Sequence, residues 1–127
     1  MDRESFQEWL EAYKLAWETR TPEAAGELFT EEALYYEAPF AEPLEGQTGV
    51  VAYWSDVPRS QKQIQFEYQI LAVTGHTGIA HWQASFVRIL SGAFVELDGI
   101  LTAEIDEDGR CRVFREWWHS KEEQQAI

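Results

Sequence analysis

The 127-residue sequence contains one cysteine, Cys111. A single cysteine excludes an intrachain disulfide and a zinc site built from several cysteines. The sequence also lacks an apolar run of about 20 residues, the length that a membrane-spanning helix needs. Its first residues lack the apolar core of a signal peptide. We therefore expect a cytoplasmic protein that makes no contact with a membrane.

Positive charge is scarce as well. Ten Lys and Arg residues stand against 23 Asp and Glu residues, which gives a formal net charge of −13. A surface this acidic repels the phosphate backbone of nucleic acids and anionic lipids, so we expect neither as a partner. The spacing of the three histidines does not match a metal site, and no glycine-rich phosphate loop is present. We therefore expect no metal and no cofactor.

Aromatic residues, in contrast, are abundant. Six Trp, five Tyr and seven Phe residues make up 14% of a chain whose length suits one domain. Side chains of this kind either fill a large core or line a pocket for an apolar ligand. Composition alone leaves both possibilities open.

The first half of the chain has the spacing of helices. Apolar residues of the first helix recur every three or four positions on one face, which comprises Phe6, Trp9, Leu10, Tyr13, Ala16 and Trp17. A threonine, a proline and a glutamate at 21–23 begin a second, short helix that runs to about residue 29. A third helix begins near Gly46 and is expected to end at Pro58.

The second half alternates between apolar and polar residues, which is typical of strands with one buried face. Turn residues separate the predicted strands at 64–70, 80–90, 94–105 and 110–119. Consecutive strands joined by short turns form an antiparallel meander. We therefore predict a single α+β domain over residues 1–127. In this cone, three N-terminal helices cover the concave face of a curved antiparallel sheet, and a loose polar tail follows at about 121–127.

Three stretches of the sequence resemble a known family. They are residues 28–33 after the second helix, residues 37–46 with Ala-Pro-Phe followed by proline and glycine, and residues 97–119 with the last hairpin. From Phe6 to about Glu122, the chain is similar to the nuclear transport factor 2-like superfamily, in its polyketide cyclase (SnoaL-like) and steroid Δ-isomerase branch. The resemblance implies the cone fold. It does not imply one function, because this fold hosts enzymes, ligand carriers and interaction modules.

The resemblance also locates the catalytic groups of the steroid isomerases, which are a general-base aspartate, a tyrosine on the first helix and a protonated aspartate on a central strand. Ala38 stands at the position of the base and Leu101 at that of the protonated acid, whereas Tyr13 lies at or next to the tyrosine position. Steroid isomerisation is therefore not expected. Glu37 precedes Ala38 and would replace the base only if the strand register shifts by one residue.

Glu116 is the main catalytic candidate. The resemblance turns Phe114, Glu116 and Trp118 inward, which would place the carboxyl group between two aromatic residues. Burial would raise the pKa of Glu116 and allow it to act as an acid or base near neutral pH. Tyr13 would then donate a hydrogen bond to a bound carbonyl group. The alternatives are a Glu116 that only binds a neighbouring Tyr or Arg, and a Tyr13 that only packs in the core.

The expected ligand is a small apolar molecule. Because Tyr35 and Tyr36 point in opposite directions on an extended strand, at most one of them faces it. The residues predicted to line its pocket are Trp17, Tyr36, Phe40, Trp54, Phe66, Tyr68, Trp82, Phe86, Leu101 and Trp118.

The last predicted strand also carries an apolar stripe on the convex face of the sheet, formed by Cys111, Val113 and Trp117. Exposed apolar stripes usually mark a partner surface, and the resemblance implies dimerisation through this face. We therefore expect a homodimer. The sequence supports a small-molecule-binding cone, with or without acid–base chemistry of the isomerase or cyclase type. The alternative is a non-catalytic interaction module that acts through the convex face.

Overall fold

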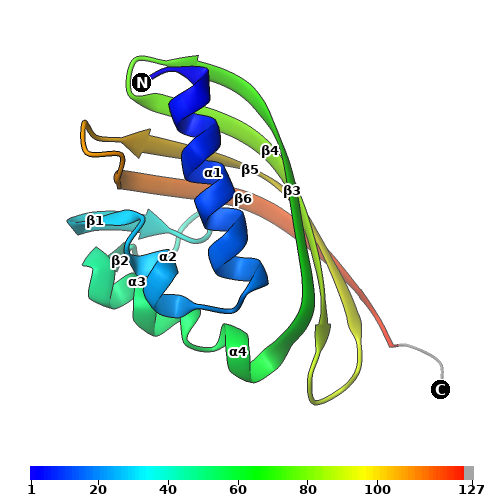
Figure 1. Cartoon of the computed structure of the whole chain (residues 1–127). Coiled ribbons are helices and arrows are strands. Elements are labelled where there is room, and N and C mark those ends of the chain that lie inside the picture. The colour runs from blue at the N-terminus through cyan, green and yellow to red at the C-terminus, as the bar shows by residue number, and fades with distance from the viewer. Residues whose placement is uncertain (125–127) are drawn as a thin grey trace.

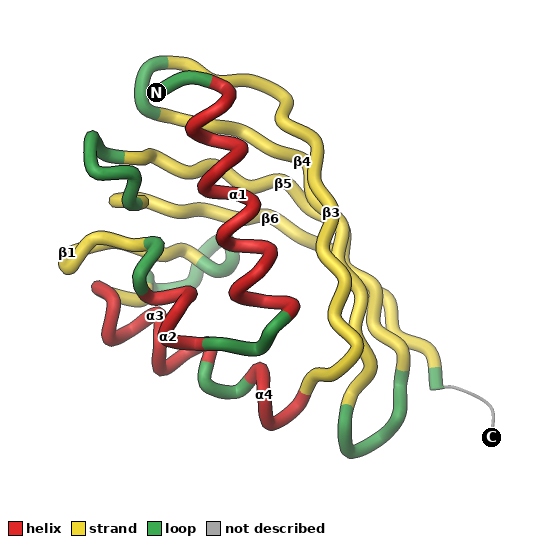
Figure 2. The backbone as a smooth tube through the Cα atoms, viewed as in Figure 1, coloured by secondary structure: helices red, strands yellow, loops and turns green. Residues whose placement is uncertain are grey.

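One large sheet curves around a layer of helices (Figure 1). The computed structural model describes residues 1–124, and within them the sheet has six strands in the order β2-β1-β6-β5-β4-β3. The helices lie on its concave side (Figure 2), so the predicted α+β architecture is confirmed. The helices are α1 Arg3–Glu18, α2 Pro22–Gly26, α3 Gly46–Trp54 and α4 Val57–Ser60. The strands are β1 Phe29–Tyr36, β2 Leu44–Glu45, β3 Gln61–Thr74, β4 Thr77–Arg88, β5 Phe94–Ile105 and β6 Cys111–Glu123.

Helix α1 begins at a reciprocal cap. Asp2 Oδ1 accepts a hydrogen bond from the Ser5 backbone N–H at 2.8 Å, and Ser5 Oγ accepts one from the Asp2 backbone N–H at 3.1 Å. Two backbone donors that the helix leaves unpaired are thereby satisfied. The buried face of α1 comprises the residues that the periodicity predicted: Phe6, Trp9, Leu10, Tyr13, Ala16 and Trp17.

The meander predicted from the alternation is confirmed for β3 to β6, whose successive neighbours are antiparallel. The sheet also contains a parallel pair, because β1 runs beside β6 in the same direction. Helix α3 differs from the prediction, since it ends at Trp54 and Pro58 lies in the first turn of the separate helix α4. A proline is tolerated there because the first N–H groups of a helix have no partner within it.

Two predicted boundaries are wrong. Helix α2 ends at Gly26 rather than near residue 29, where β1 has already begun. Strand β6 continues to Glu123, which pairs with Phe94, so 121–123 belong to the sheet rather than to a loose tail. Residues 125–127 of the predicted tail lie outside the described residues.

Cys111 is fully buried, so the prediction that it lies on the convex face is also wrong. Ile105 pairs with Cys111 while Glu104 pairs with Val113, which leaves Arg112 as an extra residue in β6. A bulge of this kind changes which residues face inward, because successive side chains on a strand alternate. Cys111 therefore points into the core, where burial raises the pKa of its thiol.

Helix α1 is attached to the free edge of the sheet. Strand β3 has a neighbour on one side only, and the backbone of Phe66 on its open side is paired by α1. The Phe66 N–H donates to Glu18 Oε2 at 2.9 Å, and Lys14 Nζ donates to the Phe66 carbonyl oxygen at 2.8 Å. Because these bonds cover an open strand edge, they both protect it from pairing with another chain and hold α1 in place.

Replacing Glu18 with alanine is therefore expected to destabilise the fold. The substitution leaves the Phe66 N–H without its charged acceptor, which costs about 1–2 kcal/mol of the free energy of unfolding. Glu8→Ala is the matched control, because Glu8 is an exposed residue of the same helix and both variants gain the same helix propensity. Urea unfolding of the two variants measures the difference, and equal stability would contradict the role given to Glu18.

Candidate functional site

An aromatic-walled cavity of about 370 Å³ lies between the helices and the inner face of the sheet. Trp17 and Trp54 belong to its helical side, and their rings contact each other edge to face at 5.7 Å between centroids. Trp82, Phe86 and Trp118 come from the strands on the opposite side. Because apolar walls of this kind release water when a ligand binds, the cavity suits a mainly apolar molecule.

The pairing of β4, β5 and β6 creates the hollow. Trp82 pairs with Gly99, and Gly99 pairs with Trp118, so these residues form one row across the sheet. A Cβ atom on Gly99 would lie 3.0 Å from Trp82 Cε2 and 2.9 Å from Trp118 Cβ. It would also lie 2.3 Å from the Trp117 carbonyl oxygen, so a larger side chain at this position would collide with the backbone of β6 as well as with the two tryptophans.

Glu116 occupies the next row of the sheet, beside its partner Leu101. Its side chain lines the cavity although the residue is only 7% exposed, and the Tyr35 hydroxyl donates a hydrogen bond to its Oε1 atom at 3.2 Å. Burial is the main cause that raises the pKa of Glu116, to about 8, and the charge of nearby Glu37 adds to it, whereas the Tyr35 hydrogen bond opposes it. The carboxyl group is therefore mostly protonated at neutral pH.

Three tyrosines surround this carboxyl group. Burial, followed by the charge of Glu116, raises the pKa of Tyr13 and that of Tyr35 far above the ordinary range. Burial and the charges of Glu116 and Glu37 also raise the pKa of Tyr53. All three hydroxyl groups consequently stay protonated and available as donors over the physiological range.

Glu37 lies close to Tyr53 and Glu116. It lies two residues after Tyr35, which faces inward, and its charge is one of the causes that raise the pKa of Tyr53. Its backbone carbonyl oxygen accepts a hydrogen bond from Trp118 Nε1 at 2.8 Å. The structure thus brings Glu37, Tyr13 and Glu116 into one region, with Glu37 outside the cavity wall.

The structure places five other predicted pocket residues away from the cavity. Phe40 is fully exposed, and Tyr36 points outward, where the Arg115 guanidinium lies 4.0 Å from its ring centroid. Tyr35 takes the inward position instead, since β1 pairs with β6 in the register that turns Tyr35 toward Phe114. The remaining residues are Phe66 and Leu101, which are fully buried in the core, and Tyr68, whose hydroxyl donates to Glu11 at 2.6 Å.

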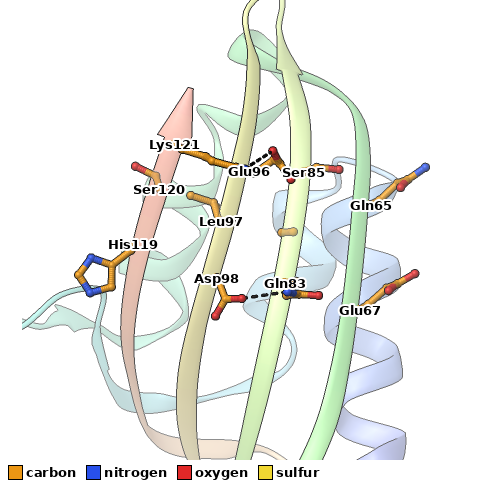
Figure 3. A pocket seen from close by; sticks show the side chains of 11 residues that line it. Gln65, Glu67, Gln83, Ser85, Glu96, Leu97, Asp98, His119, Ser120 and Lys121 are labelled. Atoms are coloured by element: carbon orange, nitrogen blue, oxygen red, sulfur yellow. Dashed lines mark hydrogen bonds and ion pairs between the residues drawn. The ribbon is translucent and has the colours of Figure 1, made fainter. Parts of the chain in front are cut away.

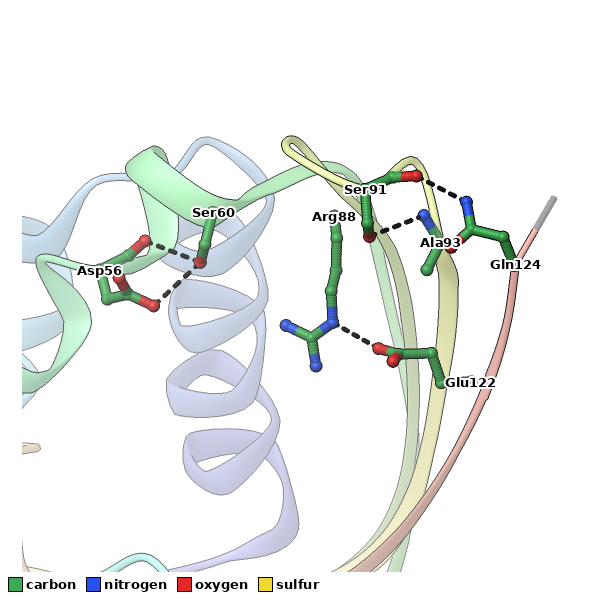
Figure 4. Close-up of polar contacts among 7 residues, drawn as sticks. All are labelled: Asp56, Ser60, Arg88, Ser91, Ala93, Glu122 and Gln124. Atoms are coloured by element: carbon green, nitrogen blue, oxygen red, sulfur yellow. Dashed lines mark hydrogen bonds and ion pairs between the residues drawn. The ribbon is translucent and has the colours of Figure 1, made fainter. Parts of the chain in front are cut away.

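The opposite end of the cavity contains polar groups that the sequence analysis missed. Asp56, Gln61 and Arg88 all line it, and Gln61 Oε1 accepts a hydrogen bond from Trp17 Nε1 at 2.9 Å. Arg88 forms an ion pair with Glu122 (Figure 4). The sequence pattern of β4 could have predicted the position of Arg88. Side chains alternate between the two faces of a strand, and Arg88 lies an even number of residues from the inward-facing Trp82 and Phe86.

A second hollow, of about 490 Å³, lies on the outer face of the sheet (Figure 3). Its side chains are mainly polar and bind one another. Gln83 Nε2 donates to Asp98 Oδ2 at 2.9 Å, and Lys121 Nζ lies 3.3 Å from Glu96 Oε1. With mainly polar side chains and no aromatic wall, this hollow is less suited to an apolar ligand than the inner cavity.

Within residues 1–124, no helix is long and apolar enough to cross a membrane. In the same part of the chain, no three His, Cys, Asp or Glu side chains come together in a way that would hold a metal ion.

Comparison with known families agrees with this architecture. The model of the SnoaL-like domain matches residues 7–114, which is most of the chain. The protein belongs to the SnoaL-like family. The match ends two residues before Glu116, so the family assignment of this SnoaL-like domain does not itself assign a role to that carboxyl group.

Solved structures resemble the SnoaL-like domain over nearly its whole length. One is a candidate isomerase from Bacillus subtilis, with 23% identity, a TM-score of 0.79 and coverage of 94% of this chain and 90% of that one. Another is SalBIII, an epoxide hydrolase/cyclase-like enzyme with a role in pyran ring formation in the polyether salinomycin, with 18% identity, a TM-score of 0.80 and 93% coverage of both chains. A computationally designed 17-OHP binder has 12% identity, a TM-score of 0.79 and coverage of 92% and 96%. At these identities the similarity shows the fold alone, and a search of curated proteins found no match.

The raised pKa of Glu116 makes a prediction about stability. Between the ordinary value of 4.5 and about 8, the unfolded chain has lost a proton that the folded chain still binds. The stability of the wild type therefore falls as the pH rises through this window. Glu116→Gln stays neutral, so its stability relative to the wild type should increase with pH, by at most about 5 kcal/mol.

Urea unfolding of both proteins at several pH values between about 5 and 8 measures this difference. Other titrating groups contribute equally to both proteins and cancel. A stability difference that does not change with pH would mean that Glu116 is not the buried acid described above.

Proposed function

We propose that this protein is an acid–base enzyme that isomerises or cyclises a small, mostly apolar molecule with a carbonyl or similar oxygen group. The observation that carries the proposal is the carboxyl group of Glu116, which is almost buried in the wall of an aromatic cavity. With a pKa of about 8, Glu116 has both protonation states populated near neutral pH. This is the property that a group needs to give and take a proton in one reaction cycle.

In an isomerisation, protonated Glu116 would give its proton to the carbonyl oxygen of the ligand. The carboxylate that results would accept the Tyr35 hydrogen bond more strongly, because the acceptor is then charged. The same carboxylate would next remove a proton from the carbon beside the carbonyl group. One proton enters the ligand and one leaves it, so the double bond moves and Glu116 returns to its starting state.

The rest of the cavity supports this chemistry in two ways. The indoles of Trp17, Trp54 and Trp82 form a wall that excludes water and strengthens polar interactions within it. Tyr13 and Tyr35 both pack against the Phe114 ring, which would hold Tyr35 in position. The isomerase and cyclase-like names of two structural neighbours, and the ligand-binding design of the third, are consistent with a reaction on a small molecule.

The proposed chemistry is not that of the steroid isomerases. Leu101 is fully buried beside Glu116 and has no group that donates a hydrogen bond to an oxyanion. Ala38 carries no base. The proton transfer therefore depends on Glu116, whose pKa the charge of nearby Glu37 helps to raise.

Proton exchange in D₂O tests this proposal without a known substrate. A panel of small cyclic ketones is incubated with the protein, and the loss of the proton beside the carbonyl group is followed by NMR. Wild type should accelerate exchange of at least one ketone, and Glu116→Gln should lower that rate by about 100-fold or more, as expected for loss of a general acid–base group. Glu123→Gln, an exposed change on the same strand, should have no effect. Equal rates for the two variants would reject the role of Glu116.

A second candidate function is interaction through the outer face of the sheet. Trp117 is 44% exposed there and lies beside its partner Ile100, with Val113 four residue pairs away along β6. A large indole that stays half-exposed gains free energy when another surface covers it. With Cys111 in the core, the stripe that supports a homodimer is formed by Val113 and Trp117.

Replacing Trp117 with glutamate should abolish such a dimer, because it places a charge in the apolar stripe. Sedimentation velocity at equal protein concentrations should find a dimer for the wild type and a monomer for Trp117→Glu, with unchanged circular dichroism. A monomeric wild type, or a variant that still dimerises, would remove this candidate.

A further inference from the structure

Arg88 lies at the end of the cavity opposite to Glu116. It is the last residue of β4 and shares the inward parity of Trp82 and Phe86. Among the described residues, Arg88 is the only Lys or Arg in the cavity wall. Arg88 is thus a lone cation in a mainly aromatic wall whose other charged residues, Asp56 and Glu116, are acids, in a protein with a net charge of −13.

Two neighbours hold the Arg88 guanidinium group in place. Its Nε atom is bound by Glu122 Oε1, and its central carbon lies 5.6 Å from the centroid of the Phe86 ring, within the range of a cation–π contact. The side chain is nevertheless 45% exposed. The guanidinium group is thus oriented while it remains accessible to a ligand.

The two terminal nitrogens of Arg88 stay available. Figure 4 shows neither of them joined to Glu122, and one of them points to the side on which Asp56 lies. Within residues 1–124, the side-chain hydrogen bond of Arg88 uses Nε. Asp56, an acid that lines the same end of the cavity, accepts a hydrogen bond from the Ser60 hydroxyl at 2.9 Å. A pair of parallel N–H donors is therefore open, and this is the geometry that binds a carboxylate with two hydrogen bonds.

We propose that Arg88 binds the anionic head of an elongated, otherwise apolar ligand, so that the substrate class of the cavity is an apolar carboxylic acid. This inference rests on the proposed function, because it takes the inner cavity as the ligand site. Six residues of β6 separate Glu116 from Glu122, a distance of about 20 Å along an extended strand. The carboxylate at Arg88 would thus direct the oxygen group of the ligand toward Glu116.

The ion pair with Glu122 does not account for Arg88 by itself. Exposed ion pairs stabilise proteins by about 0–1 kcal/mol, and this one leaves the terminal nitrogens unused. The two roles also predict opposite effects of removing Glu122. If Arg88 only pairs with Glu122, Glu122→Gln and Arg88→Met have the same consequence. If Arg88 binds an anion, loss of the competing Glu122 charge strengthens anion binding, and loss of Arg88 weakens it.

Two fluorescent probes with the same aromatic body test the proposal. Anilinonaphthalene sulfonate carries an anionic head, and N-phenylnaphthylamine is uncharged. Both are titrated into wild type, Arg88→Met, Arg88→Lys and Glu122→Gln, and urea unfolding verifies that each variant is folded. Arg88→Met should weaken binding of the anionic probe about tenfold or more, the loss expected for a charge-assisted hydrogen bond, and change binding of the neutral probe less than about twofold. Arg88→Lys should give an intermediate loss, and Glu122→Gln should bind the anionic probe at least as tightly as wild type.

The alternatives give different patterns. Equal weakening of both probes by Arg88→Met would overturn the inference, and so would weaker binding of the anionic probe to Glu122→Gln. If the wild type binds the neutral probe but Arg88→Met leaves binding of the anionic probe unchanged, the inference is overturned and the proposed function stands. A wild type that binds neither probe overturns both, because the inner cavity would then not accept an apolar body.

Discussion

The bulge at Arg112, between the Ile105–Cys111 and Glu104–Val113 pairs, sets the register of β6 against β5. With this register, Phe114, Glu116 and Trp118 follow one another on the inner face. A shift of one residue would instead turn Arg115 and Trp117 toward the helices and leave Glu116 in solvent. The position of the carboxyl group, its burial and its raised pKa all depend on this single feature of strand pairing.

The cavity has polar groups at both ends and aromatic rings between them. At one end, Glu116 is kept mostly neutral by burial and by its proximity to Glu37, and the surrounding tyrosines remain protonated. Indole rings form the middle of the cavity, and Arg88 and Asp56 lie at the other end. A ligand that complements this arrangement has an uncharged oxygen group at one end and a charged group at the other. An aromatic wall by itself would select only for size and apolarity.

The fold and the chemistry are separate conclusions. Membership of the SnoaL-like family and the close structural similarity to enzymes and to a designed binder establish the architecture, which hosts many functions. Ala38 and Leu101 stand at the positions where the resemblance implies two of the three steroid-isomerase groups, the base and the protonated acid. The acid–base proposal therefore depends on a different carboxyl group, Glu116, and on the residues that pack around it.

Local sequence patterns predicted much of the secondary structure of this protein. The spacing of apolar residues predicted the buried face of α1 and the meander from β3 to β6, because the helical and extended periods act over a few residues. The family resemblance added the cone and the inward direction of Glu116.

Other features could be decided only by the tertiary structure, because the alternation of side chains along a strand does not say which set faces inward. Alternation separates Tyr35 from Tyr36 but does not say which one faces inward, and this depends on the parallel pairing of β1 with β6, a strand far away in the sequence. The bulge that buries Cys111 and the ion pair between Arg88 and Glu122 likewise join distant segments. Short-range periodicity contains no information about such pairings, because their register is set by packing across the whole sheet.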